Sequence, residues 1–178
     1  MSGIPGWDNL WPVEPLGKPS RFPGSISDFD KRISEYDNAL ADARSQIQRN
    51  GDAEAMEKRH IREHQQYIAR QNRMIAECNR KGHKVPPETA GNIANAQELI
   101  ADSQKVLSLL PAHKAEWMAE RDKRQKWVTY LRQERAKGIG KNGEARKCGS
   151  ETQEGQPCQN EKHYREGSGW GPCTIQGH

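Results

Sequence analysis

Residues 26–47 read ISDFDKRISEYDNALADARSQI, and this stretch decides the fold. Its apolar side chains recur in alternating steps of three and four, at Ile26, Phe29, Ile33, Tyr36, Leu40, Ala43 and Ile47. This spacing places them on one stripe of a helix, the a and d positions of a coiled coil. Ser25 or Ser27 can cap the helix, and Asp28 and Asp30 suit its first turn. The stretch therefore predicts a helix that packs along a narrow seam.

The same heptad register continues beyond Gly51. Counting in sevens from the end of the quoted stretch reaches Ile61, Ile68 and Ile75. A continuous helix carries a local cost of about 1 kcal/mol for the glycine. Alternatively, Gly51 ends one helix and Asp52 caps the next. The preserved register favours a continuous helix.

Residues 82–87 (GHKVPP) end this helix, because Pro86 and Pro87 cannot continue it but can begin another. A second apolar seam follows, at Ile93, Ala96, Ile100, Ser103, Leu107, Leu110, Trp117, Val128 and Leu131, and it is widened by Leu99, Val106, Leu109 and Trp127. Pro111 breaks or kinks the middle of this helix, because proline removes a backbone hydrogen bond and clashes with the preceding turn.

We therefore expect an all-α fold, a long antiparallel helical hairpin that is coiled-coil-like and kinked near Gly51 and Pro111. Its helices span residues 26–81 and 88–137, and its turn spans residues 82–87. Breaks at Gly51 and Pro111 would instead give four helices that could fold back as a bundle. The chain is only 33% hydrophobic, which suits elongated helices that bury a narrow seam.

Residues 1–25 hold five of the ten prolines, so a helix is excluded there. We expect an extended arm that lays Trp7 and Trp11 into a groove, with Leu10 and Phe22 as further partner-binding residues. The groove could belong to the chain's own helices or to a partner subunit.

Basic residues gather between positions 121 and 147, where ten Lys or Arg stand against three acids. Such a run can contact a phosphate backbone, or it can be a solvated helix face followed by a basic linker at 138–147. The candidate nucleic-acid contacts are Arg121, Lys123, Arg124, Lys126, Arg132, Arg135, Lys137, Lys141, Arg146 and Lys147.

The chain closes on a cysteine-rich segment, residues 148–178, with the pattern C-x9-C-x14-C-x4-H. Three cysteines and a histidine are a common set for structural zinc. Neither a transmembrane helix nor a secretory signal is visible, which predicts a cytoplasmic setting where thiols stay reduced. We expect a structural Zn²⁺ module held by Cys148, Cys158, Cys173 and His178.

The local pattern from Cys148 to Asn160 is C-x3-T-x2-G-x-P-C-x-N. It resembles short zinc-binding modules of actinobacterial and phage proteins, some of them in terminase small subunits. The resemblance covers residues 148–178 and implies metal binding. Four intervening residues separate Cys173 from His178, where two or three are usual, so His163 is the alternative fourth ligand.

Other histidines and the fourth cysteine carry weaker signals. His60 and His64 are four residues apart on a helix and could share a metal, but the metalloprotease motif requires Glu immediately after the first histidine. They are therefore interpreted as surface residues. Cys78 is interpreted as a small core residue. His113 is placed at a turn, with no partner visible.

Three functional hypotheses follow. The first is a non-enzymatic structural or adaptor protein, phage-related, that binds a protein partner or self-associates and takes no small-molecule substrate. It would work in the host cytoplasm or in a virion. The second is a DNA-binding packaging protein similar to a small terminase, although the helix-turn-helix domain typical of that family cannot form in residues 1–25. A zinc hydrolase or nuclease is the remote third.

Overall fold

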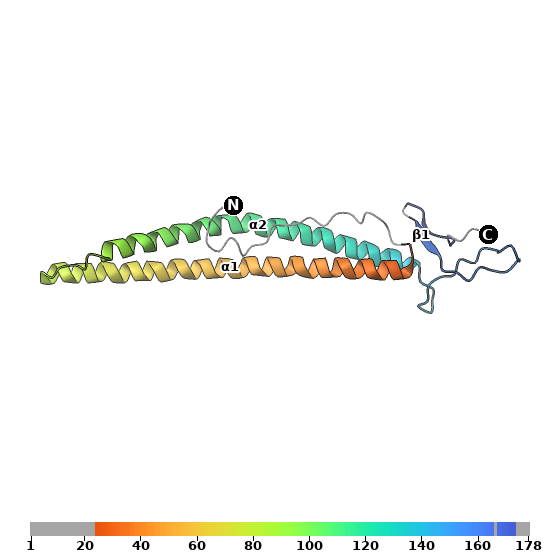
Figure 1. Cartoon of the computed structure of the whole chain (residues 1–178), viewed down its shortest axis with the longest axis horizontal. Helices are drawn as coiled ribbons and strands as arrows, with labels where there is room; N and C mark the ends of the chain where they lie inside the picture. The colour runs from red at the N-terminus through yellow and green to blue at the C-terminus, as the bar shows by residue number, and fades with distance from the viewer. Residues whose placement is uncertain (1–23, 166, 174–178) are drawn as a thin grey trace. The chain divides into compact units, whose positions relative to one another are not determined.

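The computed structural model describes residues 24–165 and 167–173 (Figure 1). Helix α1 spans Ile26–Lys81 and helix α2 spans Thr89–Lys137. Two short strands follow, β1 at His163–Arg165 and β2 at Gly169–Gly171. The two long helices pack against each other as a hairpin, which confirms the predicted fold class. None of the helices described is both long and apolar enough to cross a membrane.

Helix α1 begins at a reciprocal cap. The backbone N–H of Asp28 donates to Ser25 Oγ at 3.2 Å, and the N–H of Ser25 donates to Asp28 Oδ2 at 2.9 Å. This exchange satisfies backbone donors that have no partner within the helix. The helix then continues through Gly51, and α2 continues through Pro111. The four-helix alternative does not form, because neither helix ends at these two residues.

Helix α1 ends in a Schellman motif. His83 N–H donates to Cys78 O at 2.9 Å, and Gly82 N–H donates to Asn79 O at 3.3 Å. Gly82 has φ 68°, a left-handed conformation that glycine adopts without strain. Thr89 N–H then donates to Pro86 O at 3.1 Å as α2 starts. Local turn chemistry thus fixes the point at which the chain reverses.

The described residues fall into two compact units, residues 44–118 and residues 24–43 together with 119–173. In the first unit, Val106 and Leu110 are buried, and Ala53 and Leu107 pack against them. In the second unit, one cluster buries Phe29, Tyr36, Leu40, Val128, Leu131 and Tyr164. The second cluster includes residues from both helices and from β1, so the C-terminal segment shares the core of the hairpin.

A polar layer interrupts the apolar seam of the first unit. Asn50 is 1% exposed and lies 2.9 Å from His113, measured between Oδ1 and Nδ1. The amide of Asn50 also donates to Gln46 O at 2.8 Å. The prediction that His113 lies at a turn without a partner is wrong, because α2 continues through Pro111 and carries the imidazole into the seam.

Candidate metal centre

A hairpin-like reversal of the chain brings Cys148 and Cys158 together. Cys148 N–H donates to Asn160 O at 2.6 Å, and Cys158 N–H donates to Ser150 O at 2.8 Å, so the two segments run side by side. The loop between them closes where Thr152 N–H donates to Gln156 O at 2.8 Å. This loop contains the Thr, Gly and Pro of the sequence pattern, and those residues shape the return.

Strands β1 and β2 bring the third cysteine to the same place. They pair antiparallel, with His163 opposite Gly171 and Tyr164 opposite Trp170. Cys173 follows two residues after β2, and its N–H donates to Cys148 Sγ at 3.3 Å. The β1–β2 hairpin thus brings Cys173 close to the other two cysteines, although 14 residues separate it from Cys158 in the sequence.

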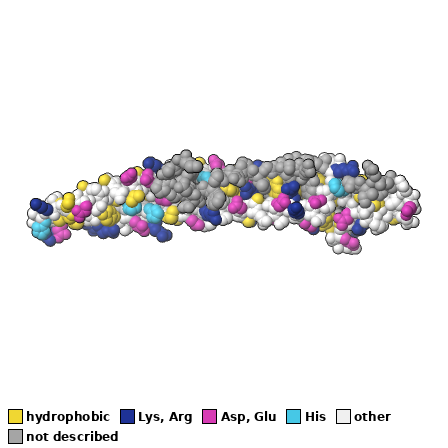
Figure 2. Space-filling model, viewed as in Figure 1, with side chains coloured by type: hydrophobic (Ala, Val, Ile, Leu, Met, Phe, Trp, Pro, Cys, Tyr) yellow, Lys and Arg dark blue, Asp and Glu magenta, His cyan; other side chains and the backbone are white. Residues whose placement is uncertain are grey.

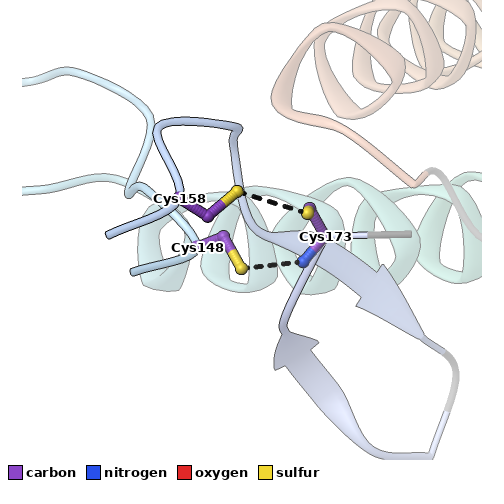
Figure 3. Close-up of side chains that lie close together, drawn as sticks. All are labelled: Cys148, Cys158 and Cys173. Carbon is purple, nitrogen blue, oxygen red and sulfur yellow. Dashed lines mark hydrogen bonds between the residues drawn. The ribbon is translucent and has the colours of Figure 1, made fainter. Parts of the chain in front are cut away.

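Three thiols converge as a result (Figure 3). The Sγ atoms of Cys148, Cys158 and Cys173 all lie within 4.8 Å of one another, and the Cys158 and Cys173 sulfurs are 3.6 Å apart. A zinc ion with sulfur ligands at about 2.3 Å sets tetrahedral S···S edges of about 3.8 Å. The three cysteines therefore lie close enough to hold a metal ion, and the spacing of the closest pair fits zinc.

The surroundings of the sulfurs favour the thiolate form. Cys148 Sγ is hydrogen-bonded to Ser150 Oγ at 3.3 Å and accepts the N–H of Cys173. These contacts, the Ser150 hydroxyl foremost, lower the pKa of Cys148 to about 6. Asn160 Nδ2 donates to Cys158 Sγ at 3.3 Å. Because the thiolate is the form that binds metal, these hydrogen-bond donors prepare the cluster for a cation.

The two candidates for the fourth ligand differ in placement. His178 lies outside the described residues. His163 lies in β1 beside Gly24, where a Cβ built on that glycine would be 2.1 Å from His163 Nε2. His163 Nδ1 is buried and has no hydrogen-bond partner among the described residues. The imidazole thus packs on the segment before α1 and is not one of the side chains in the thiol cluster.

Aromatic side chains join this segment to the helices, and sequence reasoning missed them. Phe29 of α1 contacts the rings of Tyr164 and Trp170, with centroids 5.1 and 5.3 Å away. Trp170 Nε1 donates to Glu134 O at 2.7 Å, near the end of α2. Tyr130 and Tyr164 share a hydroxyl–hydroxyl bond of 3.0 Å. The only sequence signal was the alternation of Gly and Trp at residues 169–171.

Most of the candidate nucleic-acid contacts are paired with carboxylates. Six of the ten have an acidic partner, namely Arg121, Lys123, Arg124, Arg132, Arg135 and Lys137. Arg146 Nε donates to Ile139 O at 3.0 Å. For Lys126, Lys141 and Lys147 the described part of the chain provides no acidic partner. On the face drawn in Figure 2, basic and acidic side chains are interspersed.

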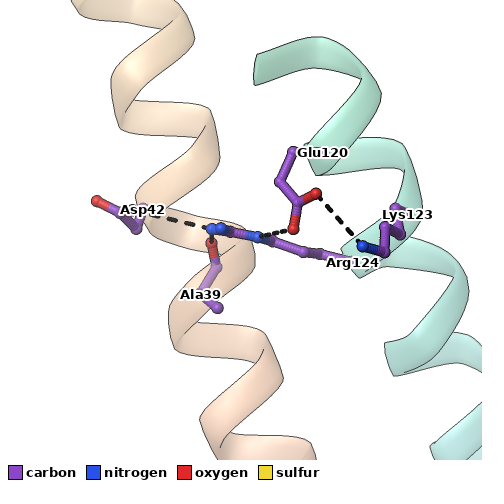
Figure 4. Close-up of polar contacts among 5 residues, drawn as sticks. All are labelled: Ala39, Asp42, Glu120, Lys123 and Arg124. Atoms are coloured by element: carbon purple, nitrogen blue, oxygen red, sulfur yellow. Dashed lines mark hydrogen bonds and ion pairs between the residues drawn. The ribbon is translucent and has the colours of Figure 1, made fainter. Parts of the chain in front are cut away.

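Arg124 is enclosed between the helices (Figure 4). Its side chain is 5% exposed, its Nε donates to Glu120 Oε1 at 3.0 Å, and its guanidinium also donates to Ala39 O at 2.6 Å. Arg124 therefore has almost no surface left for a phosphate. The prediction of Arg124 as a nucleic-acid contact overlooked that it lies on the buried face of α2.

The partner-binding residues predicted in the arm, Trp7, Leu10, Trp11 and Phe22, lie outside the described residues and stay predictions. No family model, curated protein or solved structure matches the chain. The thiol cluster and its attachment to the helices are therefore the observations from which function can be argued.

Proposed function

We propose that this chain is a non-enzymatic adaptor protein in which a helical hairpin carries a structural zinc module that contacts a partner protein. The thiol cluster supports the proposal most directly. Between residues 141 and 173, the buried residues among those described are Cys158, Tyr164 and Cys173. Two of these three are metal-ligand candidates, so a bound ion would replace the hydrophobic core that such a short segment lacks.

Zinc fits this role better than the other common ions. Thiolate ligands in a tetrahedral arrangement favour Zn²⁺, and a closed set of four protein ligands makes a zinc ion structural. We propose His178 as the fourth ligand, with His163 as the alternative. Use of His163 would require its ring to leave Gly24 and turn toward the thiols.

The adaptor role rests on the surfaces that remain outside the hairpin seam. Large hydrophobic side chains stay partly exposed on both helices, at Met56, Leu99, Leu109 and Met118. Single exposed apolar residues are ordinary, but several along a narrow hairpin suit contact with a second protein or a second copy. The predicted Trp7 and Trp11 arm would add anchors of the kind that dominate interfaces.

Native mass spectrometry of the untagged protein, purified from its source, tests the whole proposal. We expect one zinc ion in the C-terminal module and a defined oligomer or a stoichiometric complex with a partner. The Cys148→Ser/Cys158→Ser variant should lose the zinc. Cys78→Ser is the matched control, because Cys78 lies in α1 outside the thiol cluster, and this variant should keep the zinc.

Two outcomes would contradict the proposal. A metal-free protein after purification without chelators would show that residues 148–178 do not form a zinc module. A zinc-loaded monomer without a partner would support the zinc module but contradict the adaptor role. Binding to duplex DNA that weakens steeply with added salt would favour the packaging alternative, because counterion release dominates such binding.

A further inference from the structure

A second group of metal-binding side chains lies on α1, within residues 44–118. Glu57, His60 and His64 follow steps of three and four, so they share one helical face. Together with Asp102 and Ser103 of α2, they line a cavity of about 370 Å³, which Met56 and Leu99 complete. The zinc module makes no use of this cavity.

Glu57 is a third potential ligand beside the two histidines. Its side chain is only 7% exposed, and the partner that the described residues offer it is His60, with Nδ1 3.6 Å from Oε2. That separation is too long for a hydrogen bond. Neither a lysine nor an arginine of the described chain forms an ion pair with this carboxylate. A buried carboxylate is stabilised by a compensating positive charge, so a cation bound beside Glu57 would supply one.

The chemistry of the surrounding groups selects the class of cation. Two imidazoles four residues apart on a helix can chelate one ion, and imidazole nitrogens with carboxylate oxygens suit divalent transition metals. Asp102 can supply an oxygen from the facing helix, because its side chain is 30% exposed and, among the described residues, its ion pair is a surface contact with Lys105 at 3.1 Å. An ion held in this way would bridge α1 and α2.

We propose that His60, His64 and Glu57, with Asp102 from α2, form a second metal site that binds a divalent transition-metal ion. Within the described ranges, the three cysteines are the one group whose ligand atoms already lie within 4.8 Å. Capture at the cavity therefore requires the histidine side chains to change rotamer. His60 is free to do so, since its side chain is 45% exposed.

Cobalt titration of the untagged full-length chain tests this site separately from the thiol cluster. Sulfur ligands give Co²⁺ a charge-transfer band in the near ultraviolet, whereas a site of nitrogen and oxygen ligands gives d–d bands alone. We expect two bound equivalents in the wild type. The Cys148→Ser/Cys158→Ser variant should keep one equivalent without the sulfur band, so the outcome does not depend on the zinc module.

His60→Ala/His64→Ala should bind one equivalent and retain the sulfur band. Alanine is a good helix former, so this variant should fold, and circular dichroism is the check. His83→Ala is the matched control, because His83 is exposed in the turn between the helices, and it should bind two. A single equivalent that shows the sulfur band in the wild type, or two equivalents in the double histidine variant, would overturn the proposal.

Glu57→Gln tests whether the buried carboxylate contributes. The amide keeps the shape of the side chain and removes its charge, so the affinity for the second Co²⁺ should fall at least tenfold while the sulfur band stays unchanged. An unchanged second affinity would contradict the assignment of Glu57 as a ligand.

Discussion

Arg124 and Glu120 are two buried charges one turn apart on α2. The pair contributes to the contact between the helices, because the guanidinium also donates to Ala39 O of α1 at 2.6 Å. Asp42 lies 3.8 Å from the same group and adds a weaker attraction from the surface. A shift of one helix past the other would break the bond from the Arg124 guanidinium to Ala39 O, so this buried contact helps to fix the helix register.

Arg124→Ala should destabilise the protein by about 3–5 kcal/mol, because it leaves Glu120 buried without its main counter-charge. Urea unfolding followed by circular dichroism measures the change. Lys126→Ala is the control, since Lys126 is exposed and should stay within about 0.5 kcal/mol of wild type. Equal effects of the two variants would mean that the buried pair does not hold the helices.

Cys148 gives a prediction about pH. Its pKa lies at about 6 instead of 9.0, so in the metal-free protein the thiolate should persist down to about pH 6. The stability contributed by this lowered pKa is complete above pH 9.0 and is lost as the pH falls through 6. The rate of iodoacetamide alkylation at Cys148, followed by mass spectrometry, should therefore show a midpoint near 6.

Ser150→Ala provides the control, because the Ser150 hydroxyl is the largest cause of this shift. The alkylation midpoint should move toward 9.0 in this variant. If the midpoint does not move, the Ser150 hydroxyl is not what stabilises the thiolate.

At the scale of the elements, two glycines have opposite roles. Gly51 lies inside α1, and a Cβ built there meets no atom within 4 Å. Gly82 ends the same helix with φ 68°, although its Cβ would also meet open space. The difference between the two positions is therefore one of backbone conformation and not of packing.

Gly51→Ala should stabilise the protein by about 0.5–1 kcal/mol, because alanine loses less conformational entropy in a helix. Gly82→Ala should destabilise it by about 1 kcal/mol, since an L-residue is strained in the left-handed region. Thermal unfolding of the two variants measures both changes. A loss of stability in Gly51→Ala would indicate that α1 is interrupted there.

At the scale of the whole molecule, the attachment of the cysteine-rich module to the helices predicts where removal of a bound metal would act. The rings of Tyr164 and Trp170 contact Phe29, so a disordered module would also uncover the start of α1. Chelation should therefore increase amide hydrogen exchange in residues 148–173 and 26–36. Residues 106–110 belong to a separate cluster and should keep their protection.

Hydrogen-exchange mass spectrometry with and without a chelator measures this pattern. Cys148→Ser/Cys158→Ser should reproduce the exchange of the chelated protein. A chelator effect confined to residues 148–173 would show that the aromatic contacts do not couple the module to the helices.

The sequence by itself determined the hairpin and the composition of the thiol cluster. The heptad spacing, the Gly82 turn and the prolines after it act within a few residues, so they can be recognised without the fold. The approach of Cys148 and Cys158 could be predicted because the turn residues between them are local as well, whereas Cys173 is brought to them by the pairing of β1 and β2. The continuity of α1 through Gly51 follows from the periodicity, and its end at Lys81 follows from the Gly82 turn.

Tertiary structure alone decided which distant residues meet. His113 lies 63 residues from Asn50, and Arg124 lies 85 residues from Ala39, so the helix register sets these contacts. The packing of Tyr164 and Trp170 on Phe29, and of His163 on Gly24, likewise depends on where the C-terminal segment meets the start of α1. The physical reason is that periodicity and turn chemistry act locally, whereas burial and charge pairing depend on how separate segments come together.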